Sequence, residues 1–208
     1  MAEKNPDLNQ QFDPEIQLRQ ASVAQGQSVP VLRRGIKAIF VGPERSGKAE
    51  QGLNLAKKYC VCYLNTKNLL QAEAKSGSPL APKIQGSEAD ADTVLQVLEK
   101  NLDTPQCKFG FIIDGFPRNI SEAKKFDDFL VKRKTTLDTV VEFGQPDKWI
   151  FTGLLNSKNQ VGKYYSKKGA YNSVDATKPF SQVTSKIDEL FAKYVTNDRK
   201  NISMSNTH

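Results

Sequence analysis

Gly42–Lys48 is the stretch of the sequence whose residue types and spacing could hold a phosphate group. An apolar run precedes it and a helical pattern follows it, so backbone N–H groups and the positive end of a helix dipole would face an anion. The glycines permit the tight turn, and the lysine would contact the terminal phosphates. We therefore expect ATP or ADP to be bound by Gly42, Ser46, Gly47, Lys48 and Ala49.

Three residues of this segment oppose tight binding. Glu44 and Arg45 stand in the middle of the loop, where small residues usually let the backbone curl around phosphate oxygens. Glu50 stands where a hydroxyl would contact phosphate or magnesium, and its charge would repel a triphosphate. We expect nucleotide binding to be weakened.

The second chemical element is Phe111–Arg118, in which three apolar residues lead into Asp114. The acid would fall at the carboxyl end of a strand, where ligands bind in open parallel sheets. Asp114 could hold magnesium through water, and Arg118 could clamp a phosphate with two parallel hydrogen bonds. The alternative is a helix-capping aspartate and a surface arginine.

The elements around these residues predict an α/β fold. Short apolar runs alternate with helical patterns, which is typical of a five-stranded parallel sheet, P-loop NTPase-like, with helices on both faces. The expected strands are Ile36–Val41, Cys60–Leu64, Phe109–Asp114, Thr139–Phe143 and Tyr171–Asp175.

Two helical patterns are clear. After the loop, Ala49, Leu53, Ala56 and Tyr59 fall toward one side of a helix. The last helix should have Pro179 in its first turn and should carry an apolar stripe. That stripe consists of Phe180, Val183, Ile187, Leu190, Phe191 and Tyr194.

The length of 208 residues predicts one domain with tails. Residues 35–195 would form the domain. Residues 1–34 and 196–208 are polar, and we expect them to be tails that order against partners. No apolar run approaches the roughly 20 residues of a membrane span, and the start of the sequence lacks the apolar core of a secretory signal.

The cysteines predict a reducing compartment. Cys60, Cys62 and Cys107 show no disulfide spacing, and the first two alternate onto one face of an apolar run, where buried thiols are common. A zinc site is not expected, because the sole histidine is His208. We expect an intracellular location, in the cytoplasm or in a cytoskeletal or ciliary assembly, with mitochondria as an alternative.

The net charge of +7 is concentrated near the C-terminal end, where residues 150–208 carry nine bases and four acids. These are mostly scattered lysines without a nucleic-acid recognition element. We expect a solvated face, with nucleic-acid binding as the less favoured alternative.

From about residue 35 to residue 195 the sequence resembles adenylate kinases. The resemblance implies a parallel P-loop core that binds ATP and AMP and exchanges a phosphoryl group with magnesium, giving two ADP. Lys48 and Arg118 would then be catalytic. The segments that carry the resemblance are Gly42–Lys48, Thr66–Glu73, Ser76–Leu80 and Gly110–Arg118.

The sequence also departs from the family. Gln71 replaces the arginine that clamps the AMP phosphate, Asn68 replaces an aspartate, and Glu122 replaces the glutamine that contacts adenine. The mobile lid is reduced to the connection Asn156–Gln160. Between residues 35 and 195 the arginines are Arg45, Arg118 and Arg133.

Phosphoryl transfer depends on fixed cations around the moving group, so these losses favour an impaired enzyme. We expect a subunit of a larger assembly that retains the fold and weak ATP binding. Trp149 and the pair Tyr164 and Tyr165 would be interface candidates in the cleft left by the lid, or else core residues. An active short-lid kinase is the alternative.

Overall fold

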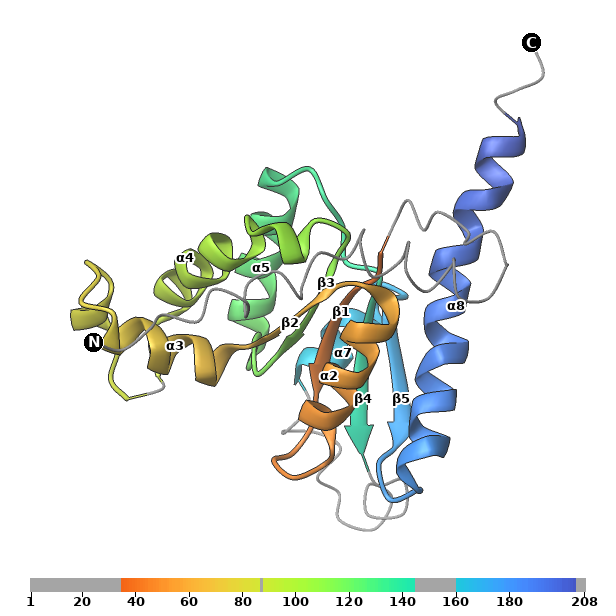
Figure 1. Cartoon of the computed structure of the whole chain (residues 1–208), viewed down its shortest axis with the longest axis horizontal. Coiled ribbons are helices and arrows are strands. Elements are labelled where there is room, and N and C mark those ends of the chain that lie inside the picture. Colours follow the sequence, from red (N-terminus) through yellow and green to blue (C-terminus); the bar gives the residue numbers. More distant parts are fainter. Residues whose placement is uncertain (1–34, 87, 145–159, 205–208) are drawn as a thin grey trace, which may run out of the picture. The chain divides into compact units, whose positions relative to one another are not determined.

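The computed structural model describes residues 35–86, 88–144 and 160–204, and of residues 195–204 it describes the backbone. One sheet has the strand order β2-β3-β1-β4-β5, and each neighbouring pair is parallel (Figure 1). The strands are β1 (Lys37–Val41), β2 (Cys62–Asn65), β3 (Phe111–Asp114), β4 (Thr139–Gly144) and β5 (Tyr171–Asp175). The predicted α/β class is confirmed.

Helices connect the strands, as parallel pairing requires. Two short 3₁₀ helices, η2 (Ala81–Lys83) and η3 (Pro105–Cys107), flank the α-helix Ala91–Leu102 along the chain. The α-helices in the described segments are α2 (Lys48–Tyr59), α3 (Thr66–Lys75), α4 (Ala91–Leu102), α5 (Ile120–Lys132), α7 (Gln160–Ser166) and α8 (Phe180–Met204).

The sheet separates two apolar clusters, because successive strand residues point to opposite faces. Ala38 and Phe40 of β1 pack with residues of α2 and α8. Ile39 points to the other face and packs with residues of α3, α4, α5 and α7. The predicted helical cover on both faces is therefore confirmed (Figure 1).

Two strands start two residues later than predicted, and the backbone explains both differences. Cys60 has a φ of 52° and ends α2, so it cannot join the following strand, which begins at Cys62. Gly110 has a φ of 150°, and its N–H donates to the Cys107 carbonyl 3.1 Å away, so β3 begins at Phe111.

The buried face of α2 was predicted in part: Ala56 is buried and Tyr59 packs against the same apolar cluster, but Ala49 and Leu53 are exposed. The helix buries Gln51, Gly52, Leu55 and Ala56, whereas Leu53 is 53% exposed. A Cβ on Gly52 would lie 2.3 Å from the Tyr63 ring, so this glycine lets the helix approach β2 closely. The close approach at Gly52 and the burial of Gln51 determine which face of α2 points to the sheet. A prediction based on the positions of apolar residues takes account of neither.

The last helix begins directly after Pro179 and buries Val183, Ile187, Leu190 and Phe191 as predicted, while Phe180 is half-exposed. Its backbone stays helical to Met204, into the range expected to be a tail. Within the described residues, no helix is both long and apolar enough to cross a membrane.

The expectation of free thiols was wrong for two of the three cysteines. Cys62 on β2 and Cys107 in η3 form a disulfide, with their Cα atoms 4.8 Å apart. Cys60 is free and partly exposed, so it does not share a buried strand face with Cys62. The two bonded residues are 45 positions apart and meet because η3 leads into β3, which pairs with β2.

Candidate functional site: the loop after β1 and its neighbours

The predicted phosphate loop lies between β1 and α2, at the carboxyl end of the central strand. Gly42 has a φ of 140°, and a Cβ there would lie 2.5 Å from the Phe143 carbonyl oxygen. Gly47 has a φ of 81° and directly precedes α2. The close approach at Gly42 therefore requires glycine, and the left-handed backbone at Gly47 favours it. The first N–H groups of α2 lie at the end of the loop.

Lys48 folds back over this loop. Its Nζ donates to the Gly42 carbonyl at 2.9 Å and the Pro43 carbonyl at 2.6 Å, and it lies 3.4 Å from the Ser46 hydroxyl. Burial lowers the pKa of Lys48, while the charges of Asp114 and Glu44 act in the opposite direction. A bound phosphate would replace the carbonyls as the partner of this ammonium group.

The residues expected to weaken binding lie on the surface of the loop and helix. Arg45 has a φ of 61°, in the left-handed region that ordinary side chains disfavour. Glu44 is exposed and lies 3.9 Å from Lys67 of α3, while Glu50 is exposed in the first turn of α2. None of them is held inside the loop.

Asp114 ends β3 and is 5% exposed. Its Oδ2 accepts hydrogen bonds from the Tyr63 hydroxyl at 2.8 Å and from the Asn65 amide at 3.2 Å. It caps no helix, because α5 is capped by Asn119. The alternative of a helix-capping aspartate was therefore wrong, whereas its other part, a surface arginine, agrees with the exposure of Arg118.

Sequence reasoning missed Tyr63 and Asn65. Both belong to β2, and Asn65 lies beside Asp114 in the parallel register of β2 and β3. Polar residues at the carboxyl end of a predicted strand were a usable signal, but only the strand order shows which acid they meet.

Arg118 follows β3, and its guanidinium is engaged by Glu122. Nε lies 3.1 Å and 3.2 Å from the two carboxylate oxygens, and Nη2 donates to Oε1 at 2.7 Å and to the Ala89 carbonyl at 3.1 Å. Arg118 is partly exposed, whereas the Glu122 side chain is 8% exposed. The bonds to Glu122 raise the pKa of Arg118. The planar fork expected to clamp a phosphate therefore holds a carboxylate of the same chain.

Comparison with known proteins decides the family. The adenylate kinase family model matches residues 40–203. The chain belongs to the adenylate kinase family. It is 36% identical over 116 residues to adenylate kinase 4 of Arabidopsis thaliana, covering 53% of this chain and 47% of that protein. It is 35% identical over 130 residues to an adenylate kinase of Yarrowia lipolytica, covering 60% and 52%. The chain spans about half the length of these curated relatives.

A bacterial adenylate kinase from Azorhizobium caulinodans matches over a longer stretch. It is 27% identical over 190 residues, which is 98% of that protein but 74% of this chain. Since 74% of 208 residues is fewer than 190, part of this relative faces gaps in the chain. Residues 145–159, which include most of the short connection expected in place of a lid, lie outside the described residues.

In this adenylate kinase fold, α3 offers no arginine toward the strand ends. Asn68 is exposed, and its backbone N–H donates to the Asn65 side chain that caps α3. Gln71, one turn later, is also exposed. The two departures from the family therefore lie on the surface of the helix.

The paired tyrosines of α7 join this helix to α5. The Tyr164 hydroxyl donates to Oδ2 of Asp127 at 2.8 Å, and Tyr165 lies 3.0 Å from Oδ1. Lys168 forms an ion pair with the same carboxylate. Tyr165 is 1% exposed, so it is a core residue and not an interface candidate. Trp149 lies outside the described residues.

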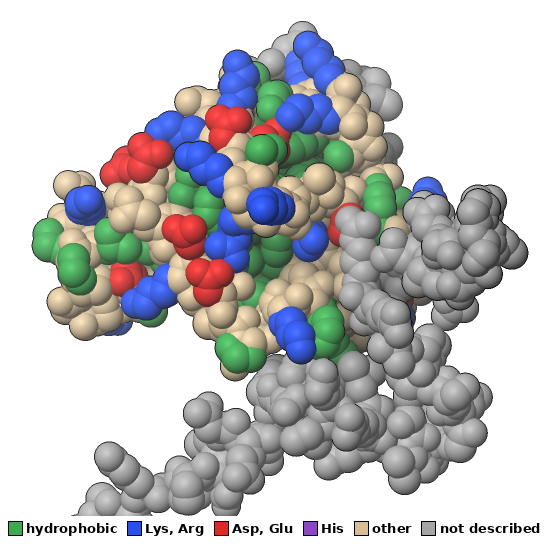
Figure 2. Space-filling view, turned by 90° about the horizontal axis from the view of Figure 1, so that it is seen from above, with side chains coloured by type: hydrophobic (Ala, Val, Ile, Leu, Met, Phe, Trp, Pro, Cys, Tyr) green, Lys and Arg blue, Asp and Glu red, His purple; other side chains and the backbone are tan. Residues whose placement is uncertain are grey.

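Three lysines of the described C-terminal part, Lys168, Lys178 and Lys186, have acidic partners close by. Lys168 pairs with Asp127, and Lys178 lies 3.8 Å from Asp175. Figure 2 shows basic and acidic side chains interspersed over the face seen from above. A mixed surface of this kind favours the solvated-face interpretation over a nucleic-acid patch.

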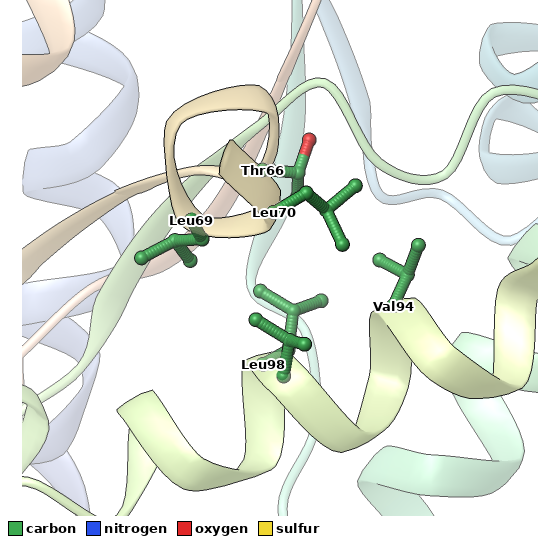
Figure 3. Close-up of a pocket in the computed structure, with 6 residues that line it drawn as sticks. Thr66, Leu69, Leu70, Val94 and Leu98 are labelled. Atoms are coloured by element: carbon green, nitrogen blue, oxygen red, sulfur yellow. The ribbon is translucent and has the colours of Figure 1, made fainter. Parts of the chain in front are cut away.

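Helices α3 and α4 pack against each other through apolar side chains. Figure 3 shows Leu69 and Leu70 of α3 facing Val94 and Leu98 of α4, with Thr66 at the rim. The small pocket between them lacks charged side chains, so it does not resemble a phosphate site. Among the described residues, no group of three or more acidic, histidine or cysteine side chains could hold a metal ion.

Proposed function

We propose that this adenylate kinase family member binds ATP or ADP weakly at Gly42–Ala49, transfers phosphoryl groups poorly or not at all, and serves as a subunit of a larger assembly. The observation that carries the proposal is the Arg118–Glu122 pair, because it binds to a carboxylate the guanidinium that was expected to clamp the phosphate of AMP. The loop glycines and Lys48 support retained nucleotide binding.

The wider charge distribution supports the same function. Among the arginines with described side chains, Arg133 binds Asp103 with Nη2 2.5 Å from Oδ1, and it stacks over Phe129. Arg133 follows the C-terminal end of α5, whereas Arg118 precedes its first turn, so the two arginines lie at opposite ends of this helix. Loss of one arginine that stabilises the transition state costs about 10³- to 10⁵-fold in rate. Arg45, the third, lies on the exposed loop.

An active kinase remains the second candidate because one observation favours it. Lys48 begins α2 after the loop that follows β1, and Asp114 lies beside Phe40 of β1 in the sheet, so the two groups expected around the donor phosphates come from neighbouring strand ends. The relatives reported above are all named adenylate kinases.

A coupled assay of ADP formation separates the two functions. With ATP, AMP and magnesium at high protein concentration, we expect the wild-type rate to equal that of Lys48→Ala. Turnover that Lys48→Ala abolishes would establish the kinase and overturn the proposal of impaired transfer.

Nucleotide binding is tested separately by calorimetry with ADP. The wild type should bind, and Lys48→Ala should bind at least about tenfold more weakly, because a charge-assisted bond to phosphate contributes about 1.5–3 kcal/mol. Thr135→Ala, a change outside the loop and its neighbours, is the matched control and should bind as the wild type does. Absence of wild-type binding would remove the nucleotide from the proposal.

The proposed role in an assembly rests on the polar sequence of residues 1–34. The full chain and a chain lacking residues 1–34 would be compared as bait for partners from the native cell. We expect the deletion to lose partners that the full chain retains. Equal recovery by both baits would contradict docking through this segment.

A further inference from the structure

The two carboxylate oxygens of Asp114, the residue expected to hold magnesium through water, differ in their contacts. Oδ2 accepts from the Tyr63 hydroxyl at 2.8 Å and from the Asn65 amide at 3.2 Å. Within the described residues no donor bonds to Oδ1, and this atom is not sealed from solvent, although the whole residue is 5% exposed. One oxygen is therefore committed to the chain and the other is open.

The open oxygen fits the way in which proteins bind magnesium. The ion keeps several waters and is usually held by one or two carboxylates together with phosphate oxygens, without a dedicated cage of side chains. A carboxylate that holds it through water accepts hydrogen bonds from the metal-bound waters, and Oδ1 of Asp114 is available for them. When bound with a nucleotide, magnesium neutralises part of the charge of the phosphates.

The carboxylate lies between the two strands that flank β3. Ile112 packs in the cluster that includes residues of α2, and successive strand residues alternate between faces, so Asp114 points to the face that α2 covers. On one side, β1 leads into the loop; on the other, β2 carries the donors Tyr63 and Asn65. Because Oδ2 is bonded toward β2, Oδ1 is the oxygen left for the loop.

Both donors are held by second contacts. The Tyr63 ring lies against α2 at Gly52, where a Cβ would lie 2.3 Å from Cε2. The Asn65 side chain caps α3, since its oxygen accepts from the Asn68 N–H at 3.1 Å, and this leaves its amide nitrogen for Asp114. Neither side chain can turn away from the carboxylate without losing its other contact.

The backbone of Asp114 is anchored from the same part of the chain. The hydroxyl of Thr66, which begins α3, donates to the Asp114 carbonyl at 3.0 Å. The following residue, Gly115, has a φ of 94°, and a Cβ there would lie 2.5 Å from that hydroxyl oxygen. With the main chain fixed, the carboxylate can leave its orientation only by breaking its bonds to Tyr63 and Asn65.

We infer that Tyr63 and Asn65 are positioning residues, which hold Oδ2 of Asp114 so that Oδ1 is presented to the waters of a magnesium ion carried by a nucleoside diphosphate on the loop. The inference rests on the nucleotide binding proposed above. In this role both residues act through Asp114. Loss of either donor frees the carboxylate to turn, so a variant should bind the metal-free nucleotide as the wild type does and gain less affinity from magnesium.

The test is calorimetric titration of the full chain with ADP, in excess magnesium chloride and in EDTA. We expect the wild type to bind at least about tenfold more tightly with magnesium, and Asp114→Asn to reduce this ratio to about threefold or less. Equal wild-type affinity in the two buffers, or a full magnesium effect in Asp114→Asn, overturns the inference and leaves nucleotide binding standing. Absence of binding in both buffers refutes the nucleotide binding and the inference with it.

Two variants test the part assigned to β2. Tyr63→Phe removes one donor from Asp114, and Asn65→Ser removes the amide while keeping an oxygen that can cap α3. In each, the magnesium effect should fall by at least about threefold, whereas the dissociation constant in EDTA should stay within about twofold of wild type. Tyr59→Phe is the matched control, because its hydroxyl bonds to Asp188, and it should keep the full effect.

A merely structural role for these donors would give a different result, because it would weaken binding equally in both buffers. If both variants lose affinity to the same extent in EDTA and in magnesium, or if both keep the full magnesium effect, the positioning role given to Tyr63 and Asn65 is wrong.

Discussion

Arg118 and Glu122 hold each other through both side chain and backbone at the start of α5. The Arg118 N–H donates to Oε2 of Glu122 at 2.7 Å, and the guanidinium Nη2 donates to Oε1 at the same distance. The Asn119 side chain in turn accepts from the Glu122 N–H at 3.0 Å and caps the helix. A phosphate could bind Nε and Nη2 of this arginine only by displacing a buried carboxylate that also binds the backbone.

Glu122→Gln should therefore create acceptor binding that the wild type lacks. The neutral amide keeps the shape of the side chain but releases the guanidinium charge, and a charged hydrogen bond contributes about 1.5–3 kcal/mol. We expect the affinity for AMP, measured by calorimetry, to rise by about tenfold or more. The double variant with Arg118→Ala should lose the gain. Unchanged AMP affinity in Glu122→Gln would show that the pair does not limit this site.

The sheet was predictable from sequence because its strands are short apolar runs between helical patterns. Ile36–Val41 and Phe109–Asp114 were located to within two residues, and Tyr171–Asp175 matches β5. The spacing of the glycines and the lysine in the loop was recognisable because the glycines permit a tight turn and the lysine lies where a phosphate would bind. Patterns of this kind can be predicted from sequence because each depends on a few adjacent residues.

The remaining features depend on which distant residues become neighbours. The donors to Asp114 come from β2, 49 and 51 positions away. The disulfide joins Cys62 and Cys107 across a similar separation. The bond of Arg118 to Glu122 is local, yet a salt bridge between exposed helix neighbours is usually weak. Its importance follows from the burial of Glu122, which sequence does not show.

The cap of α4 predicts a pH-dependent stability. Asp90 Oδ1 accepts from the N–H groups of Asp92 and Thr93, each at 2.9 Å, and Oδ2 accepts from the Thr93 hydroxyl. The bonds from Thr93 are the main cause of a lowered pKa for Asp90. Since the folded state favours the ionised form, this stabilisation is present above the unfolded pKa, about 3.9, and is lost as the pH falls through the lower folded value.

Asp90→Ala should lower the free energy of unfolding at pH 7 by about 1 kcal/mol, the usual contribution of an N-cap. Urea denaturation at a series of pH values should show that the difference in unfolding free energy between Asp90→Ala and wild type becomes smaller below about pH 4. Asp90→Asn, which keeps an acceptor without the charge, serves as the control. A gap that stays constant down to pH 3 would contradict the contribution of the ionised carboxylate.

The disulfide predicts a stability that depends on reductant. It closes a loop of 45 residues between β2 and η3, and cross-links of this kind stabilise proteins by about 2–4 kcal/mol. Urea denaturation with and without reductant should differ by that amount in wild type and not in Cys107→Ala. Alkylation of the unfolded oxidised chain should modify Cys60 alone. Modification of all three cysteines without reductant would show that the bond does not form.

Gln51 should stabilise the fold by joining two helices. It lies on α2, which begins with Lys48 of the loop, and it bonds to residues at the start of α8. The glutamine is 1% exposed; its Nε2 donates to the Phe180 carbonyl at 2.9 Å, and its Oε1 accepts from the Thr184 hydroxyl at 2.8 Å. Gln51→Leu should cost about 1–3 kcal/mol, because it leaves a buried carbonyl with one donor fewer. The Thr184 hydroxyl has one proton, which it can donate either to Oε1 of Gln51 or to the Phe180 carbonyl. The effect of Thr184→Ala should therefore not simply add to that of Gln51→Leu. In a double-mutant cycle with Thr184→Ala, urea denaturation should give an interaction energy above about 0.5 kcal/mol, and additive effects would contradict the coupling.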